Sequence, residues 1–377
     1  MIKVLIGGDV CPIGRNRELF EQGDVQALFT DLLSEFEQAE LAVVNLECPF
    51  ITASTPIDKV GPVFGVSNEC VKGLKAASIK ALNLANNHIL DHGEEGLLNT
   101  LEVCREAGLQ TFGAGKDLQQ AREILVSNIQ GLRIGLFGVA EHEFSIAGND
   151  RAGANPLDLI DFTRNVRERR ADFDFLIVLM HGGNEYYAYP SPRLAETCHF
   201  MIELGANAVI CQHSHCAGCH EKYRDGYIVY GQGNLIFDYG QKGSAWNMGF
   251  LVKLNIEDEI TFGLQFIPYI QSGVHPGVRA MLDKPATEFV SEIEARSKSI
   301  LQRDFIKNQW LDYCFNSKYT YQNSLLMPWR MLKWLNRRGL LAKLLYPAKH
   351  LTRMHNLIRC EAHREVIETI LEKRYWG

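Results

Sequence analysis

The feature that most constrains this chain is a series of apolar runs, most of which end in a short polar motif. An apolar run of strand length followed by a turn is typical of a buried β-strand. In an open α/β sheet the ends of such strands meet at one crevice, where ligands bind. We therefore expect the polar motifs to lie close together. They are Gly8-Asp9-Val10-Cys11, Asn45-Leu46-Glu47, Asn86-Asn87-His88, His181-Gly182-Gly183 and His213-Ser214-His215.

Strand and helix patterns alternate along the first two thirds of the chain. Apolar runs predict strands at 2–8, 41–44, 79–84, 173–180 and 206–211, and helical periodicity predicts helices at 25–38, 93–107, 156–170 and 191–204. This βαβα alternation predicts a mainly parallel sheet covered by helices. From 226 to 268 the pattern changes to strands joined by tight turns, which we expect to be antiparallel and to complete a second sheet.

The length of 377 residues favours one large domain with an appendage. We place the domain at residues 1–284 and a helical, basic extension at residues 285–377. Between Tyr313 and Cys360 the extension carries nine Lys or Arg and no Asp or Glu. The net charge of the whole chain is −6, so we expect no nucleic-acid partner.

The first residues enter a strand directly, without the apolar segment and cleavage site of a signal peptide. No apolar run approaches the roughly 20 residues that a membrane helix needs. Ten cysteines in a chain of this size do not form a disulfide framework, so we expect free thiols. These features predict a cytoplasmic location, with membrane association through the basic extension as an alternative.

The polar motifs offer hard oxygen donors and imidazoles, which together suit divalent metal ions such as Mn, Zn or Fe. Two such ions about 3.5–4 Å apart can clamp the attacking and leaving oxygens of a displacement. The candidate ligands are Asp9, Glu47, Asn87, His181, His213 and His215. His213 and His215 point the same way if their segment stays extended. His88 directly follows Asn87 and is a candidate general acid.

Each residue also has a purely structural explanation. Asp9 could occupy a turn or cap a helix, Asn87 could close a turn, and His181 could be a hydrogen-bonded core histidine. Three histidines at the ends of two apolar strands are harder to explain this way, because burying imidazoles without partners is costly. Taken together, the set favours metal binding.

Two other metal sites compete with this interpretation. The cluster Cys211, Cys216, Cys219 and His220 has the spacing of a structural zinc knuckle. It would leave the three histidines unexplained. The His-x-His pair also occurs in barrel amidohydrolases, but there it belongs to an early strand, and eight regular βα repeats are not visible here.

Longer segments around the motifs resemble a known family. They are Gly-Asp-Val, Val-Asn-Leu-Glu, Leu-Ala-Asn-Asn-His-Ile-Leu-Asp-His-Gly, His-Gly-Gly-Asn-Glu-Tyr, Gln-His-Ser-His and Gly-Gln-Gly-Asn-Leu-Ile-Phe-Asp. In this order they resemble the CapA proteins, bacterial poly-γ-glutamate capsule synthesis proteins of the calcineurin-like metallophosphoesterase superfamily. The likeness covers about residues 1–270. It implies a four-layer α/β/β/α sandwich with a two-metal site at the top of the central sheets.

The resemblance assigns a role to each candidate. Asp9 resembles the first-motif aspartate, and Glu47 takes the place of the aspartate that bridges the metals. Asn87 and His88 resemble the Asn-His of the family motif, with His88 catalytic and Asp91 beside it. His181, and the pair His213 and His215, resemble the later histidine ligands. Asp91, Glu185 and Asn234 are expected to support the ligands from behind.

Two departures from the superfamily pattern bear on the chemistry. The first motif is usually Asp-x-His, and here it is Asp9-Val10-Cys11. Cys11 is either a thiolate ligand, which would favour zinc, or a bystander constrained by the following Pro12. Glu47 has one methylene more than the aspartate it replaces.

The segment from Trp329 to Arg338, continuing to Lys349, is basic and aromatic. It is either a solvated helical extension or a contact for an anionic lipid surface, an anionic polymer or a synthase. The leading hypothesis is a metal-dependent hydrolase of the metallophosphoesterase type in capsule or poly-γ-glutamate biosynthesis. Its substrate would be a phosphoester or a γ-glutamyl bond of an envelope polymer. The alternative is a non-catalytic assembly factor that binds an anionic polymer or a synthase.

Overall fold

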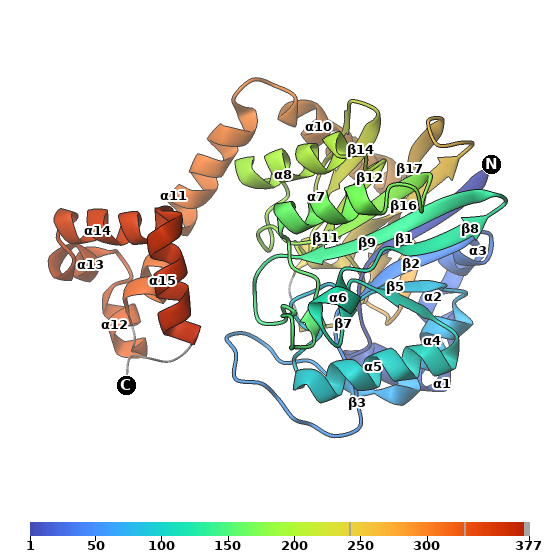
Figure 1. The fold of residues 1–377 in the computed structure, drawn as a ribbon, viewed down its shortest axis with the longest axis horizontal. Helices are drawn as coiled ribbons and strands as arrows, with labels where there is room; N and C mark the ends of the chain where they lie inside the picture. The colour runs from blue at the N-terminus through green and yellow to red at the C-terminus, as the bar shows by residue number, and fades with distance from the viewer. Residues whose placement is uncertain (241–242, 328, 373–377) are drawn as a thin grey trace. The chain divides into compact units, whose positions relative to one another are not determined.

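The computed structural model describes residues 1–240, 243–327 and 329–372, which form two compact units, Met1–Lys307 and Asn308–Gly377 (Figure 1). The division falls later than the expected boundary at 284/285. Helix α10 (Asp283–Ile300) lies beyond that boundary but belongs to the first unit. It buries Phe289 and Ile293 in an apolar layer and packs against β13 (His220–Tyr223) and β17 (Phe262–Gln271), which explains the later division.

Two sheets form the centre of the first unit. The order of the first sheet is β18 (Val278–Ala280), β17 (Phe262–Gln271), β16 (Met248–Ile256), β1 (Ile2–Cys11), β2 (Leu41–Leu46), β5 (Ala81–Asn83) and β6 (Gln110–Phe112), with β15 (Asn234–Phe237) beside the end of β1. The order of the second is β13 (His220–Tyr223), β14 (Gly226–Tyr230), β12 (Ala208–Gln212), β11 (Phe175–His181), β9 (Leu132–Ala140) and β8 (Leu125–Ile129). Strands β1, β2, β5 and β6 are parallel, as are β9, β11, β12 and β14.

The sheets pack face to face through side chains that alternate along their strands. Val4 and Ile6 of β1 point into a layer shared with Ile177 of β11. Leu5 points the other way, toward helices that cover the first sheet. Those helices are α1 (Arg17–Gln22), α2 (Val25–Phe29), α3 (Leu33–Glu37), α4 (Val71–Ala76) and α5 (Gly93–Ala107).

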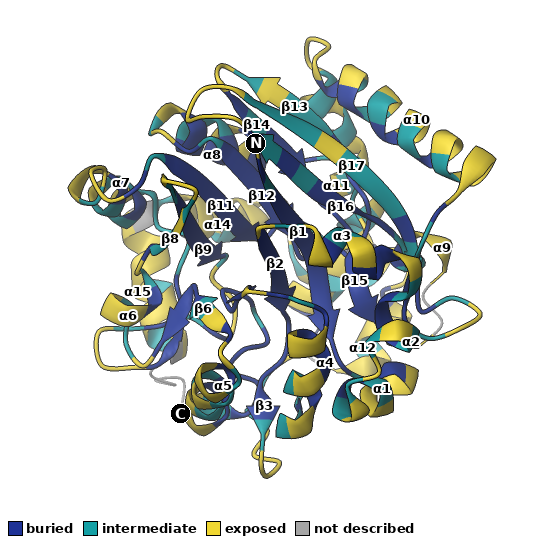
Figure 2. Ribbon diagram, turned by 90° about the vertical axis from the view of Figure 1, so that its right-hand side faces the viewer, coloured by how far each residue is buried: buried dark blue, intermediate teal, exposed yellow. Residues whose placement is uncertain are grey.

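Helices α7 (Leu159–Glu168) and α8 (Pro192–Glu203) cover the outer face of the second sheet through Phe162 and Met201. Figure 2 shows the result: dark, buried strands in the middle and helices whose outward faces are exposed. The expected four-layer α/β/β/α sandwich is therefore confirmed.

The expectation for residues 226–268 is wrong in its sheet assignment. Strand β14 joins the second sheet, but it runs parallel to β12. Strands β16 and β17 are antiparallel, yet they extend the first sheet through β1, where Ile6 pairs with Val252. Alternation of apolar residues reveals which face of a strand is buried. It does not reveal which sheet edge the strand joins.

Local patterns predicted the helices with mixed success. The helix expected at 93–107 coincides with α5. The helix expected at 25–38 is interrupted at Thr30, whose φ of 45° is incompatible with a continuous helix. Thr30 instead donates a hydrogen bond from Oγ1 to the Val278 carbonyl, 2.7 Å away. A long-range contact therefore replaced the local helical one.

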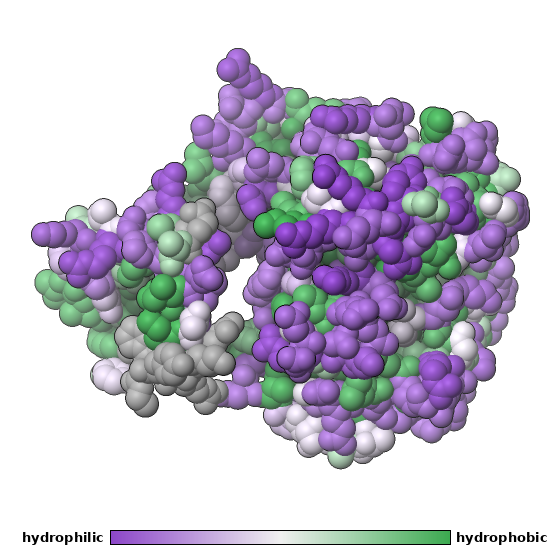
Figure 3. Space-filling view, in the orientation of Figure 1, coloured by the Kyte–Doolittle hydropathy of each residue, from purple (hydrophilic) through white to green (hydrophobic). Residues whose placement is uncertain are grey.

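The second unit is helical, as expected. It contains most of α11 (Phe305–Leu326), followed by α12 (Arg330–Leu335), α13 (Leu340–Leu345), α14 (Ala348–Arg359) and α15 (Glu361–Glu372). Leu326, Met327 and Ala342 form its buried centre. Green, apolar residues lie among purple, hydrophilic ones on the face drawn in Figure 3. Within the described residues, no helix combines the length and hydrophobicity needed to cross a bilayer.

Candidate metal centre

The parallel strands bring the polar motifs to one place. Asp9 lies near the end of β1, Glu47 directly follows β2, and His181 is the last residue of β11. Asp9 pairs with Asn45 in the register of β1 and β2. Gly8 is required by close packing, because a Cβ there would lie 2.0 Å from the Gly233 carbonyl oxygen. The strand ends of both sheets therefore contribute to one centre.

Two groups of buried side chains within the described residues have the geometry to hold a cation. One is Glu47, His181 and His213, and the other is Asp9, Glu47 and His215. The candidate ligand atoms within each group lie within 4.8 Å of one another. Glu47 belongs to both groups: its Oε1 is 3.3 Å from His181 Nε2 and 3.9 Å from His215 Nε2. The arrangement suits a carboxylate shared between two cations.

Asn87 reaches the same centre from the turn after β5. Its Oδ1 lies 3.1 Å from His181 Nε2, and its Nδ2 donates to Glu143 Oε2 at 2.6 Å. The Nδ2 contact turns the carboxamide oxygen toward the histidine. All six ligands expected from the sequence thus lie at or beside one cluster. Glu143 was not foreseen, because no motif distinguishes it from other surface glutamates.

Glu47 provides the test of whether a cation fits here. Its side chain is fully buried, and neither Oε1 nor Oε2 accepts a hydrogen bond from the described residues. Burial raises the pKa of Glu47 to about 8, although the positive charge of His88 opposes the shift. Burial and the charge of Glu47 likewise raise the pKa of Asp9 to about 7. Buried carboxylates without partners are costly, and a divalent cation supplies the missing partner.

The histidines carry lone pairs suited to the same cations. Burial lowers the pKa of His181, and it lowers the pKa of His213 far more, with His181 adding to the effect. Both imidazoles are therefore neutral at pH 7 in the metal-free protein. His215 Nδ1 lies 2.8 Å from Asn234 Oδ1, so Nδ1 donates and Nε2 keeps its lone pair. This is the contact expected of a supporting Asn234.

The His213-Ser214-His215 segment does not stay extended, so the condition under which both histidines were expected to point the same way is not met. Strand β12 ends at Gln212, and φ is 89° at His213 and 54° at His215. Such left-handed residues cost about 1–3 kcal/mol each and persist where the surroundings hold them. The His213 N–H donates to Asp9 Oδ2 at 3.2 Å, and the two imidazole rings lie 5.9 Å apart. A turn, rather than a strand, brings both histidines to the cluster.

Three asparagines orient Asp9 from behind. Asn45 Nδ2 donates to Asp9 Oδ1 at 2.8 Å. Asn45 Oδ1 in turn accepts hydrogen bonds of 3.2 Å from both Asn83 and Asn86. This buried network was not foreseen from the sequence. The sequence nevertheless contains an indication of it, since the asparagines lie at the ends of neighbouring strands, where buried amides need partners.

A second buried cluster lies beside the ligands. His88 Nδ1 is 2.6 Å from Asp91 Oδ2, which also accepts from the Phe64 N–H at 2.7 Å. Lys59 Nζ donates to Asp91 Oδ1 at 2.6 Å. Lys59 was not foreseen either, because a lone lysine in a Pro- and Gly-containing loop carries no pattern. Glu185 is exposed, and its negative charge raises the pKa of Glu47.

The cysteines lie outside both cation-binding groups of the described residues. Cys11 packs in the apolar layer under the first set of helices beside Cys48, and burial raises the pKa of its thiol well above the ordinary value. This placement favours the bystander interpretation. Cys211 instead contacts Cys198, with 3.6 Å between the sulfurs, and His220 contacts Glu294 at 3.0 Å. These contacts do not assemble a zinc knuckle.

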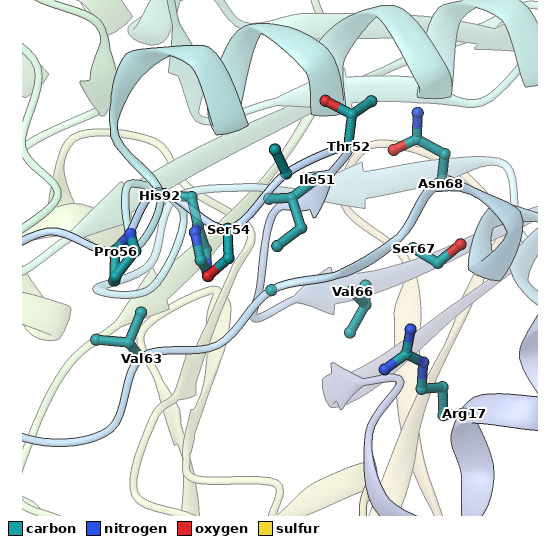
Figure 4. A pocket seen from close by; sticks show the side chains of 12 residues that line it. Arg17, Ile51, Thr52, Ser54, Pro56, Val63, Val66, Ser67, Asn68 and His92 are labelled. Carbon is teal, nitrogen blue, oxygen red and sulfur yellow. The ribbon is translucent and has the colours of Figure 1, made fainter.

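A separate cavity of about 730 Å³ opens on another part of the first unit (Figure 4). Its lining includes Arg17, Thr52, Ser54 and His92 and none of the candidate metal ligands. His92 follows Asp91 directly in the chain and accepts a hydrogen bond of 2.8 Å at Nδ1 from the Thr55 N–H. The lining also includes Pro56 and Val63, which belong to the loop that carries Lys59.

Solved structures show only distant similarity to the chain. One, described as a novel phosphatase from Mycoplasma pneumoniae, is 14% identical, covers 76% of this chain and 96% of its own, and has a TM-score of 0.46. A hypothetical protein from Thermus thermophilus is 11% identical, covers 71% and 99%, and has a TM-score of 0.44. Similarity at this level does not bear on the chemistry of the centre.

Sequence relatives are closer. The capsule biosynthesis protein CapA of Bacillus anthracis is 32% identical over 226 residues, which are 57% of this chain and 54% of the relative. The PGA biosynthesis protein CapA of Bacillus subtilis (strain 168) is 32% identical over 178 residues, 46% of this chain and 47% of the relative. A probable polyglutamine synthesis accessory protein of Mycobacterium tuberculosis is 29% identical over 213 residues, 53% and 56%. The chain spans about half the length of the curated relatives it matches.

The family model described as "Bacterial capsule synthesis protein PGA_cap" matches residues 3–239, which is more than half of the chain. The matched segment contains every candidate ligand from Asp9 to His215, together with the strands that place them. The chain belongs to the family of bacterial capsule synthesis proteins.

Proposed function

We propose that this protein is a metal-dependent hydrolase that acts in the synthesis of a capsule polymer. The observation that carries the proposal is Glu47, a buried carboxylate that belongs to both groups of candidate ligands and accepts no hydrogen bond from the described residues. Phosphoesters are the first substrate class to test. A γ-glutamyl amide is the second, because relatives are named for PGA or polyglutamine synthesis.

Asp9, Glu47 and His215 would hold one divalent cation, and Glu47, His181 and His213, with Asn87 beside them, would hold another. Oxygen and imidazole donors suit Mn, Zn or Fe. Two such cations lower the pKa of water and neutralise charge on a phosphoester when bound. The ligands thus supply the electrostatic part of the catalysis.

His88 supplies the proton in this mechanism. Its Nδ1 is held by Asp91, so Nε2 is the ring atom from which a proton can reach the leaving oxygen. A water oxygen bonds to phosphorus, the bond to the leaving oxygen breaks, and the leaving oxygen takes its electron pair and the His88 proton. One proton of the water is released, and His88 regains one from solvent.

The test measures the metal content and the turnover rate of the same protein preparations. The His213→Ala variant is expected to lose bound metal and more than about 100-fold in turnover, since even partners of metal ligands are worth about 10–100-fold. His275→Ala, in an exposed loop, is the matched control and should change neither. Full metal content and full activity in His213→Ala would refute the proposal.

His88→Ala separates proton donation from metal binding. It should keep its metal and lose about 10²–10⁴-fold in turnover of a phosphodiester with a poor leaving group. The loss should be much smaller with a 4-nitrophenyl leaving group, which needs little protonation. Equal losses on both substrates would argue against His88 as the acid.

A second candidate function is suggested by the charge of the second unit, whose segment between Tyr313 and Cys360 carries nine basic and no acidic residues. In this alternative, the protein is a non-catalytic assembly factor that binds an anionic polymer or a synthase. Complementation of a capsule-deficient strain distinguishes the two. An assembly factor tolerates His88→Ala, whereas a hydrolase does not.

A further inference from the structure

Lys59 is a buried cation in an exposed loop. The loop from Thr52 to Phe64 carries solvent-exposed residues on both sides of the lysine, and Val60 is 84% exposed. The Lys59 side chain, in contrast, is 1% exposed. An ammonium is rarely buried without a specific partner, because removing it from water is costly. Its contacts therefore indicate what it does.

The Lys59 ammonium contacts both members of the His88–Asp91 pair. Nζ donates to Asp91 Oδ1 at 2.6 Å and to the Asn87 carbonyl oxygen at 3.2 Å, and it lies 3.3 Å from His88 Nδ1. A phenyl ring covers it, with 5.1 Å between Nζ and the Phe144 centroid. One side chain thus touches three parts of the motif: the Asn, the His and the Asp.

The loop is fastened to the same motif on both sides of the lysine. Before it, the Ile57 N–H donates to the Asp91 carbonyl at 3.0 Å. After it, the Phe64 N–H donates to Asp91 Oδ2 at 2.7 Å, and the Phe64 ring lies 4.6 Å from the His88 ring. Pro56 and Val63, which lie before and after the lysine in the loop, line the separate cavity (Figure 4). The Lys59 side chain instead contacts His88, the candidate proton donor.

We propose that Lys59 is a positioning residue for proton donation. Its ammonium holds the Asp91 carboxylate in place, and Asp91 in turn holds His88. These contacts keep the loop packed against the Nδ1 side of the imidazole. A buried pair that served stability alone could be replaced by apolar side chains without loss. Here the pair instead ends on the imidazole of His88, which directly follows the candidate ligand Asn87 in the chain. The inference rests on the proposed function, since it assigns Lys59 a part in the same reaction.

The test compares Lys59→Met, Lys59→Arg and His88→Ala in the metal-loaded full chain. With a phosphodiester that has a phenyl leaving group, Lys59→Met should lower kcat by about 100-fold, the scale of a misplaced catalytic group. KM should change by less than about threefold, because substrate binding is not the step affected. Lys59→Arg should recover most of the rate. Lys72→Met, at an exposed lysine of α4, is the control and should behave as wild type.

Three further readouts separate positioning from a general structural role. Metal content should stay unchanged, and the loss should shrink with a 4-nitrophenyl leaving group, as for His88→Ala. The double variant Lys59→Met/His88→Ala should be no slower than His88→Ala alone. Limited proteolysis should cut the 52–64 loop faster in Lys59→Met, a result that needs no turnover. If Lys59→Met does not fold, Lys59→Gln, which keeps two donors, takes its place.

Losses that multiply in the double variant, or that are equal for both leaving groups, would overturn the positioning role. An active wild type with a fully active Lys59→Met would overturn this inference and leave the proposed function standing. A fully metal-loaded wild type that turns over neither phosphodiesters nor γ-glutamyl amides would overturn both.

Discussion

Glu47 and Asp91 are both fully buried carboxylates in segments that follow strands of the first sheet, β2 and β5, but their surroundings are opposite. Asp91 has three partners from the chain: Lys59, His88 and a backbone N–H. Glu47 accepts no hydrogen bond from the described residues. A buried negative charge needs a compensating positive one. For Asp91 the chain supplies that charge as a lysine. For Glu47 the described residues supply no hydrogen bond, and the side chains grouped with it are further candidate metal ligands.

The difference indicates that the two clusters have different roles. The Asp91 cluster is complete without any added ion, so it can hold an imidazole rigidly. The Glu47 cluster is complete only with a cation, so both its stability and its chemistry depend on cation binding. Mutations at the two carboxylates should therefore differ in the sign of their effect on stability.

The largest effect is expected for Glu47→Gln. The amide cannot bridge two cations, so bound metal should fall sharply and turnover should fall by more than about 100-fold. In the metal-free protein the same change should stabilise, by on the order of 3 kcal/mol at pH 7, because it removes a carboxyl group that folding forces to bind a proton. Elemental analysis measures the bound metal, and urea unfolding in the presence of a chelator measures the stability of the metal-free protein.

The stability of the metal-free protein should also depend on pH through Glu47. The pKa of Glu47 is raised from 4.5 to about 8 by burial, so the folded metal-free state binds more protons than the unfolded state between these values. The free energy of unfolding should therefore fall as pH rises from about 4.5 to 8, and less so in Glu47→Gln. Identical pH profiles for the two proteins would mean that Glu47 has a partner after all.

For Asp91→Asn the expected effect on stability is of similar size to that of Glu47→Gln but of opposite sign, and it does not depend on bound metal. This change leaves the Lys59 ammonium buried beside a neutral group, which should destabilise by about 3–5 kcal/mol in the metal-free and metal-loaded forms alike. Thermal unfolding with and without chelator measures it. Asp225→Asn, at an exposed position, is the control. A stability equal to wild type would show that Asp91 and Lys59 are not a functioning pair.

The smallest effect is expected at Asp174, a carboxylate that is partnered and only partly buried. Asp174 accepts hydrogen bonds from the Arg133 side chain and its N–H, and these lower the pKa of Asp174 to about 2. Because the folded pKa is depressed, the stabilisation is complete above about pH 4 and is lost as pH falls toward 2. Wild type and Asp174→Asn should differ slightly near pH 6 and converge in acid, which urea unfolding at several pH values measures. A difference that grows in acid would contradict the pairing, and Asp225→Asn, at an exposed position, again serves as the control.

The candidate ligands were predictable from sequence because each sits at the end of an apolar run. The burial of β1, β2, β11 and β12 and the parallel order of their strands follow from those runs and the helices between them. The sheet that β16 and β17 join was not predictable, since two sheets offered several free edges. The His213-Ser214-His215 turn was not predictable either, because a positive φ at histidine is imposed by contacts such as the one with Asp9.

By itself, then, the sequence determined which residues face the apolar layers and which polar groups stand at the strand ends, since both follow from local patterns of side chains. Tertiary structure decided which of those groups would have partners. Lys59 meets Asp91 across 32 residues of chain through a loop with no repeating pattern, and no local rule specifies that encounter. Whether a buried carboxylate receives its positive charge from the chain or from a cation is thus settled by which distant segments fold against it.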